Sequence, residues 1–294
     1  LFLLAVGIRK LRSRREDCSC APYGDLDLTA FYGKLSFDLT GAQRRAIGEI
    51  LADFASGQPM NRLVQGDVGS GKTMVAAAAM VCAVKNGFQA ALMAPTEILA
   101  EQHHRGLSAL LEGLGIPCAL LTGAMPAKAR REVLERLERG EIRVLTGTHA
   151  LLGEGVAFQN LGLVVTDEQH RFGVAQRAAL SAKGERPHLL VMSATPIPRT
   201  LALLIYGDLD VSVIDELPPG RQTVETYAVT GAYHQRVYKF IDKQIAAGRQ
   251  AYIVCSMVEE NDTIPDDRKA ASAYAKMLQE QVFPHLRVAC VHGR

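Results

Sequence analysis

Short apolar runs alternate with helical patterns along most of this chain. After Asp38, stretches with helical periodicity at 72–85, 97–111 and 127–139 lie between apolar runs that are long enough for strands. Strands that alternate with helices are joined by right-handed crossovers, and this favours a mostly parallel sheet. The pattern therefore predicts an α/β domain. The expected strands are 62–65, 90–94, 118–121, 143–146, 161–166 and 189–193.

A break interrupts this pattern at Leu217-Pro218-Pro219-Gly220, because two prolines and a glycine in succession seldom continue a helix or a strand. The alternation then resumes, so we expect a first α/β domain at 35–217 and the start of a second, truncated one at 218–294. Residues 18–32 carry no usable pattern, and 1–34 are expected to form a helix and a linker. The second domain is expected to have apolar strands at 223–229, 251–255 and 287–291 and helices at 233–247 and 270–281.

Composition narrows the class of protein. The chain has 294 residues, 48% hydrophobic and 22% charged, which is typical of a globular protein with about two domains. Its formal net charge is only +2, so any contact with nucleic acid must come from a local basic patch. The six cysteines are scattered and form no disulfide framework, which indicates a cytoplasmic protein.

The two ends suggest a fragment. The chain starts with Leu1 rather than Met, and it stops just after an apolar run. Its apolar start precedes basic residues, the reverse of a secretory signal, and is much too short to cross a membrane. We therefore expect no contact with a membrane and a longer parent protein.

A phosphate-binding loop follows the first expected strand. Its sequence is Gly66-Asp67-Val68-Gly69-Ser70-Gly71-Lys72-Thr73, which fits G-x-x-x-x-G-K-[ST] at every fixed position and opens a helix. The glycines let backbone N–H groups face a phosphate, and the helix N-terminus adds positive potential. Lys72 would reach the β- and γ-phosphates, and Thr73 would hold Mg²⁺.

Two carboxylates follow the apolar run at 161–166. Asp167 and Glu168 would lie at the carboxyl end of a parallel strand, where ligands bind in open sheets. Asp167 could hold Mg²⁺ through water, and Glu168 could polarise the attacking water. The pair alone is typical of a helix start, and it is the phosphate loop that favours the catalytic interpretation. Adjacent His103 and His104 point to different helix faces, so they make no metal pair.

These motifs together resemble a known family. The box Asp167-Glu168-Gln169-His170, with the phosphate loop and Ser193-Ala194-Thr195, is similar to superfamily 2 helicases. Longer blocks at 167–174, 193–200 and 208–221 resemble the RecG family of bacterial DNA helicases. The resemblance is strong over 35–294 and weak over 1–15. It implies a RecA-like phosphate-loop motor domain with a mostly parallel sheet, followed by the N-terminal part of a second RecA-like domain.

The resemblance also implies roles for single residues. Gln43, in the segment 37–43, would recognise adenine, and its amide can both donate and accept. Thr40 is also a good helix N-cap, and both roles are compatible. Other residues are expected to contact the DNA backbone or to couple nucleotide state to domain movement: Pro95, Thr96, Thr148, His149, His170, Ser193, Thr195 and Arg199.

The family further implies ATP and Mg²⁺ as cofactors and branched or double-stranded DNA as the partner of a monomeric, cytoplasmic bacterial enzyme. Such enzymes remodel stalled forks and Holliday junctions in recombination and repair. An upstream wedge domain and the rest of the second motor domain, with its completing arginine, are expected to lie outside this chain. The fragment is therefore expected to bind ATP and to hydrolyse it poorly.

Other interpretations remain open at this point. The transcription-repair coupling factor Mfd, a double-stranded DNA translocase, shares the blocks at 167–174 and 193–200. A phosphate-loop kinase or nucleotide switch would need an acceptor pocket and would not predict the D-E-x-H box. A non-catalytic binding module would not need Lys72, Thr73, Asp167 and Glu168 together.

Overall fold

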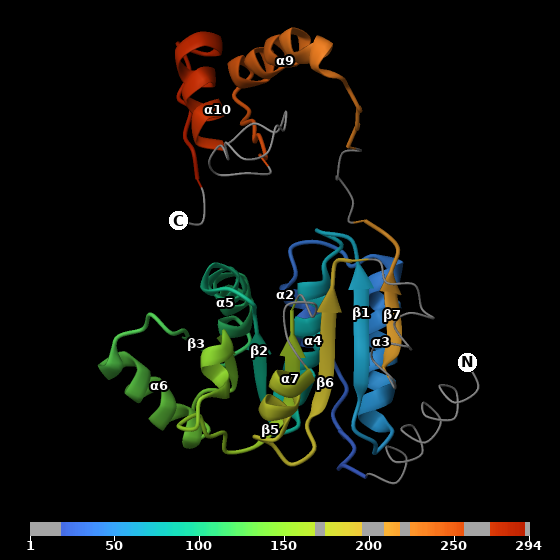
Figure 1. The fold of residues 1–294 in the computed structure, drawn as a ribbon. Helices are drawn as coiled ribbons and strands as arrows, with labels where there is room; N and C mark the ends of the chain where they lie inside the picture. Colours follow the sequence, from blue (N-terminus) through green and yellow to red (C-terminus); the bar gives the residue numbers. More distant parts are fainter. Residues whose placement is uncertain (1–18, 168–173, 196–208, 218–223, 256–270, 292–294) are drawn as a thin grey trace, which may run out of the picture. The chain divides into compact units, whose positions relative to one another are not determined.

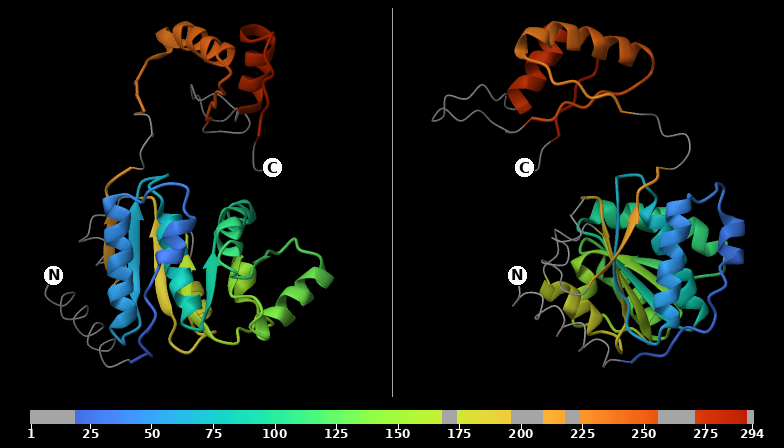
Figure 2. Two further views of the ribbon diagram at one scale, coloured as in Figure 1. Left: turned by 180° about the vertical axis from the view of Figure 1, so that it is seen from behind. Right: turned by 90° about the vertical axis from the view of Figure 1, so that its right-hand side faces the viewer.

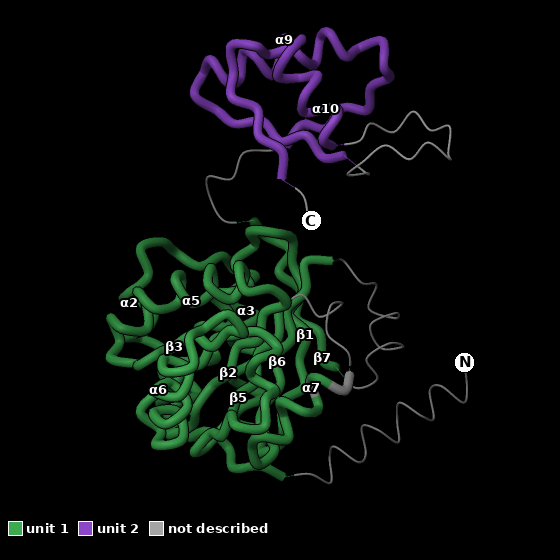
Figure 3. Tube along the Cα trace, turned by 60° about the vertical axis from the view of Figure 1, so that its left-hand side comes forward, with its two compact units in different colours: residues 1–221 green, residues 222–294 purple. Residues whose placement is uncertain are grey.

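The computed structural model describes residues 19–167, 174–195, 209–217, 224–255 and 271–291. The chain divides into two compact units, residues 1–221 and residues 222–294 (Figure 3). The first unit holds every motif that the sequence singles out, and it is described first.

The first unit is built on a seven-stranded sheet in which every pairing is parallel. Its strand order is β3-β4-β2-β5-β6-β1-β7, and all of these strands except β4 are labelled in Figure 1. The strands are β1 (Asn61–Gly66), β2 (Gln89–Met93), β3 (Cys118–Leu121), β4 (Val144–Gly147), β5 (Leu161–Thr166), β6 (His188–Ser193) and β7 (Asp210–Ile214).

Helices cover both faces of this sheet (Figure 2). One face carries α2 (Thr29–Lys34), α3 (Gly41–Ala55), α4 (Lys72–Lys85) and α5 (Glu97–Glu112). The other carries α6 (Ala127–Glu138), the 3₁₀ turn η1 (His149–Leu152) and α7 (Val174–Ser181). Cover on both faces is what a parallel sheet requires, and it explains why the strands read as continuous apolar runs.

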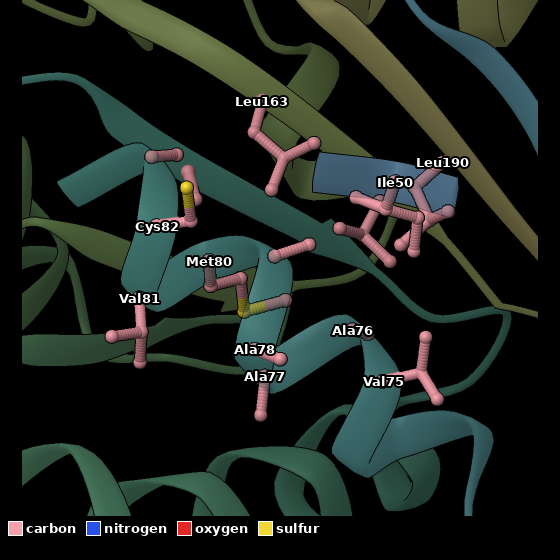
Figure 4. Packing of buried hydrophobic residues seen from close by; sticks show 14 of the residues in the cluster. Ile50, Val75, Ala76, Ala77, Ala78, Met80, Val81, Cys82, Leu163 and Leu190 are labelled. Atoms are coloured by element: carbon pink, nitrogen blue, oxygen red, sulfur yellow. The ribbon is translucent and has the colours of Figure 1, made fainter. Parts of the chain in front are cut away.

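Successive side chains along a strand point to opposite faces of the sheet, and this divides the core into two layers. Leu163 and Val165 of β5 face the layer of α3, α4 and α5, whereas Val164 faces the layer of α6 and α7. Helix α4 is apolar on nearly all sides, and Val75 to Ala83 are buried (Figure 4). Its run of alanines lets the helix lie close to the sheet, which fixes the position of the loop that precedes it.

All six strands expected in the first domain are present, with bounds that differ by at most a residue or so. Helices at 72–85, 97–112 and 127–138 also confirm the expected ones. Strand β7 was not among the expected strands. It lies at the sheet edge beside β1, and its alternation of buried Ser212 and Ile214 with exposed Val213 gives only a weak apolar signal.

The described part of the expected linker belongs to the core of the first unit. Tyr23, Leu28 and Phe31 are buried, and the Tyr23 ring stacks on Phe88 with centroids 5.0 Å apart. Residues 19–34 therefore pack on the domain. This packing was not predictable, because the segment is too short and irregular to show a helical or strand period.

The second unit contains the short turn η3 (Gly231–Tyr233), α9 (His234–Ala246), α10 (Ala271–Met277) and the π-helical turn η4 (Leu278–Val282). Tyr238, Leu278 and Phe283 form its small core. The helices expected at 233–247 and 270–281 are both confirmed. The second of them consists of α10 followed by the π-helical turn η4.

The prediction of strands in the second unit is wrong for the residues that the structure describes there. Residues 224–229, 251–255 and 287–291 form no strand, and the side chains of Val224, Val254 and Val291 are 76%, 95% and 92% exposed. Apolar residues of a parallel strand are stable only when both faces are covered, and these are not. Within the described ranges of the whole chain, we find no helix with the length and apolar content needed to cross a bilayer.

Candidate functional site

The sequence-predicted site residues meet at one edge of the sheet. The phosphate loop follows β1, Pro95 and Thr96 follow β2, Thr148 and His149 follow β4, and Asp167 follows β5. The register aligns these exits, because Met93 pairs with Gly147 on one side and with Thr166 on the other. The carboxyl edge of a parallel sheet is the usual place for a ligand site.

The phosphate loop has the backbone that its glycines make possible. Gly69 and Gly71 have φ values of +78° and +85°, in the left-handed region that other residues rarely adopt. Gly71 is the N-cap of α4 and offers no side chain to the first N–H groups of that helix. Lys72 lies back over the loop, with Nζ 2.7 Å from the Gly66 carbonyl oxygen and 2.9 Å from that of Asp67.

Gln43 joins the start of α3 to this loop. Its Oε1 accepts a hydrogen bond from the Thr40 backbone N–H at 2.9 Å, while the Thr40 hydroxyl accepts from the Gln43 N–H at 3.2 Å. This is a capping box, and it confirms Thr40 as the N-cap. Gln43 Nε2 also donates to the Ser70 carbonyl oxygen at 2.8 Å. The side chain predicted to recognise adenine is therefore held against the phosphate loop.

The donor set of this site suits a nucleotide with a divalent cation. Asp67, Val68 and Gly69 of the loop are exposed, so their backbone can be approached from outside. The buried Ser70 Oγ has no hydrogen-bond partner among the described residues. Backbone N–H groups, an ammonium, a hydroxyl and a carboxylate are the kinds of group that bind phosphates and Mg²⁺ in phosphate-loop proteins. This site offers them from the loop, Lys72, Thr73 and Asp167.

Asp167 is held on two sides at the end of β5. Its backbone N–H donates to the Met93 carbonyl oxygen at 2.9 Å, which extends the β2–β5 pairing by one residue. Its Oδ2 lies 2.6 Å from Nε2 of His103, and only 8% of the residue is exposed. Sequence reasoning missed His103, because nothing in the spacing of 103 and 167 indicates that they meet. Glu168 and His170 lie outside the described residues.

The two segments expected to contact DNA follow adjacent strands. Thr96 is exposed and caps α5, since its hydroxyl accepts from the Leu99 N–H at 3.3 Å. His149 is also exposed. Thr148, in contrast, is 1% exposed and caps η1. Its hydroxyl accepts a hydrogen bond from the Ala150 N–H at 3.5 Å, and its expected contact with DNA stays a prediction.

A pair of hydroxyls ends β6. Ser193 Oγ lies 2.9 Å from Thr195 Oγ1 and also accepts from the Thr195 backbone N–H at 3.2 Å. Ser193 pairs with Gln65 of β1 in the sheet, so the pair is next to the strand that carries the phosphate loop. Arg199, the remaining predicted contact, lies outside the described residues.

The exit from β7 is fastened to α3, which the sequence did not predict. The Arg45 guanidinium donates to Asp215 at 2.8 Å and to the Val213 carbonyl oxygen at 3.1 Å. The hydrogen bond from Arg45 lowers the pKa of Asp215 below its usual value. Glu216 accepts from the Ala42 N–H at 3.1 Å, beside the capping box. Residues 213–216 thus end against the helix that carries Gln43.

The residues that form this site belong to a segment that matches a known protein family. A model of the DEAD/DEAH box helicase family matches residues 40–204, which is more than half of the chain. The chain belongs to the DEAD/DEAH box helicase family. The match runs from the capping box past the hydroxyl pair after β6, and it favours a helicase over the kinase or switch interpretation.

Individual relatives agree with the resemblance found in the sequence. The chain is 50% identical over all of its length to the ATP-dependent DNA helicase RecG of Synechocystis sp., and 50% identical over 92% of its length to that of Bacillus subtilis. It covers 35% and 40% of those two proteins, so it spans well under half of the relatives it matches. The resemblance to RecG is confirmed.

Solved structures support the fold. A structure of RecG bound to a three-way DNA junction aligns with a TM-score of 0.80 and 42% identity, over 96% of this chain and 37% of that one. The DEAD-box helicase Mss116, bound to ssRNA and UDP-BeF, aligns with a TM-score of 0.59 over 76% of this chain and 51% of that one. Its 18% identity shows a shared fold alone. The predicted RecA-like fold with a parallel sheet is confirmed for the first unit.

Proposed function

We propose that this chain is the ATP-binding part of a DNA motor that remodels branched DNA, as in stalled forks and Holliday junctions during recombination and repair. The observation that carries the proposal is the similarity over 96% of the chain to a RecG structure bound to a three-way junction. The meeting of the phosphate loop, Asp167 and two exposed segments at one sheet edge supports it. The protein would act in the bacterial cytoplasm, as a monomer.

The nucleotide would lie along the loop after β1. The loop N–H groups and Lys72 would bind its phosphates, Thr73 and Asp167 would hold Mg²⁺, and Gln43 would recognise adenine. Gln43 and Lys72 are both already bonded to the loop. ATP supplies a phosphoryl group that water can attack, and the metal neutralises charge on it. Glu168 would orient that water and accept its proton.

DNA would contact the neighbouring part of the same edge. Thr96 and His149 are exposed after adjacent strands, and helix α5 presents its N-terminus beside Thr96. Helix N-termini and hydroxyls suit phosphate oxygens, so these contacts would be to the backbone and carry little sequence information. Pro95, His170 and Arg199 would extend this surface. Ser193 and Thr195 would exchange hydrogen-bond partners when the nucleotide changes state.

Residues 218–294 would form the first part of a second RecA-like domain. The similarity to RecG extends through this segment, since it covers the whole chain. In the family, the completing arginine for hydrolysis comes from that second domain. We therefore propose that the 294-residue chain binds ATP and turns it over slowly.

Binding to branched DNA tests the proposal. The chain is titrated with a labelled three-way junction and with a linear duplex of equal length, at several salt concentrations and with a non-hydrolysable ATP analogue present. We expect affinity for both DNAs to fall steeply as salt rises, because contacts to phosphates release counterions. Affinity that does not depend on salt, or no binding to either DNA, would count against a DNA motor.

A further inference from the structure

Helix α5 and the residue that follows strand β5 meet through a pair of largely buried side chains. His103 Nε2 and Asp167 Oδ2 are 2.6 Å apart, and both side chains are only 11% exposed. A hydrogen bond from a ring N–H to a carboxylate is charge-assisted, and such bonds are shorter and stronger than neutral ones. The contact joins residues that are 64 positions apart in the sequence.

The pair constrains the carboxylate that the proposed function assigns to Mg²⁺. The backbone of Asp167 is fixed by its bond to Met93, and His103 fixes one carboxylate oxygen. A carboxylate held in this way does not have to be ordered when a metal ion or its water arrives. Groups that orient the ligands of a metal influence its affinity strongly, and their loss typically lowers affinity or activity about 10–100-fold.

The same helix also carries a predicted DNA contact. Thr96 is the N-cap of α5, and His103 follows it by seven positions. Seven residues of α-helix span about 10 Å, so a single rigid element extends from the exposed segment to the Asp167 carboxylate. If DNA binding shifted α5, His103 would move with the helix and would change the position of the Asp167 carboxylate.

We propose that His103 is a positioning residue that holds Asp167 ready for Mg²⁺ and links it, through α5, to bound DNA. This inference rests on the proposed function, because it needs Asp167 to serve a metal–nucleotide complex. His103 itself touches neither nucleotide nor DNA in this account, and its effect passes through Asp167.

The chain offers a matched control in the next residue. His104 lies on the same helix and is partly buried, but its ring contacts Ser108, with Nδ1 and the hydroxyl 3.4 Å apart. His104→Ala therefore removes an equal side chain from α5 without touching Asp167. His103→Ala removes the bond to Asp167, and His103→Gln keeps an N–H at a similar reach.

The test measures binding rather than turnover. A fluorescent, non-hydrolysable ATP analogue is bound to the full chain, and the Mg²⁺ concentration for half-maximal binding is recorded together with the thermal midpoint of each variant. We expect His103→Ala to raise that concentration about 10–100-fold. His103→Gln should lie closer to wild type, and His104→Ala should match wild type.

A DNA titration tests the link through α5. Duplex DNA should change the affinity for the analogue in wild type, and by reciprocity the analogue changes the affinity for DNA by the same factor. In His103→Ala this factor should shrink toward one, while His104→Ala keeps it. An undiminished factor in His103→Ala would overturn the link.

The outcomes separate the inference from the proposed function. If wild type needs Mg²⁺ and His103→Ala needs the same amount, the positioning role is overturned, and a lowered thermal midpoint would then mark a purely structural contact. If wild type binds no nucleotide, or binds it without regard to Mg²⁺, the proposed function fails first and the inference falls with it.

Discussion

Gln43 and Gly71 show how closely the candidate nucleotide site is packed at the scale of single residues. The Gln43 amide donates to Ser70 in the phosphate loop, and a Cβ built on Gly71 would collide with Gln43 Nε2. Gly71 also has a φ of +85°, which a side chain would strain. A glycine is thus required at this position for two reasons: the left-handed backbone conformation and the close approach of the Gln43 side chain.

Gly71→Ala should therefore impair nucleotide binding. The left-handed conformation costs a residue with a side chain roughly 1–2 kcal/mol, and displacement of Gln43 adds to this. Because about 1.4 kcal/mol corresponds to a tenfold change, we expect affinity for an ATP analogue to fall tenfold or more. Fluorescence titration of the analogue measures it.

Gly106→Ala is the control for that substitution. Gly106 lies inside α5, is exposed, and has open space where its Cβ would be. Alanine at this position should leave nucleotide affinity unchanged and stabilise the fold by about 0.5–1 kcal/mol. Equal affinity of Gly71→Ala and wild type would show that the loop glycine does not need its present conformation.

The sequence predicts those parts of the site whose residues are neighbours in the chain, and it does not predict contacts between residues far apart in the chain. The phosphate loop is contiguous, and its chemistry follows from eight adjacent residues. Thr40 as a cap is local as well. The contact between His103 and Asp167 depends on which helix follows which strand and on the register of β2 with β5. No pattern in the chain encodes such a meeting.

Among the elements, a partly buried ionic cluster around Arg62 anchors the helix that carries Gln43. Arg62 of β1 donates from Nε to Asp53 at 2.6 Å and from Nη1 to Glu49 at 3.0 Å, both on α3. It also donates to Ser212 of β7 at 2.9 Å, and Ser212 in turn bonds to Glu49. One guanidinium therefore holds α3 against two strands.

Arg62→Ala should destabilise the first unit strongly. The Arg62 side chain is only 11% exposed, whereas those of Glu49 and Asp53 are 38% and 21% exposed, so water can replace part of the lost contact. Removal of one partner of a largely buried hydrogen-bonded group costs about 1–3 kcal/mol. Urea unfolding of the variant and of wild type gives the difference in free energy.

An exposed pair provides the comparison. Arg131 and Glu135 lie one turn apart on α6, with 73% and 53% of their side chains exposed. Arg131→Ala should change the free energy of unfolding by about 0.5 kcal/mol or less. If the two variants were equally stable, the cluster at Arg62 would not anchor α3.

Six strands of the first unit were predictable as continuous apolar runs, and α4, α5 and α6 were predictable from their helical spacing. Strand β7 was missed, since an edge strand with Ser212 facing inward lacks a continuous apolar run. Helices α2 and α7 were not among the expected elements either. In the second unit, the same kind of apolar run also predicted strands, but the described residues there form none. A run such as 251–255 shows that a segment can form a strand, but pairing and cover come from other parts of a sheet.

For the whole molecule, the relatives that the chain matches are much longer than the chain itself. The chain covers 35% of the Synechocystis RecG and 37% of the RecG chain solved with a three-way junction. The candidate catalytic residues of the first unit would thus be only one part of the proposed motor. Turnover coupled to DNA is the property that distinguishes such a machine from a phosphate-loop kinase or switch.

The most direct test is ATP turnover with and without a synthetic forked DNA, with Lys72→Ala as the blank. It is measured on this chain and on a version extended through a complete second motor domain. We predict that the extended version turns over ATP, that the fork stimulates it, and that this chain is slow. Turnover that forked DNA leaves unchanged, or turnover that survives Lys72→Ala, would contradict the assignment of a DNA-driven motor.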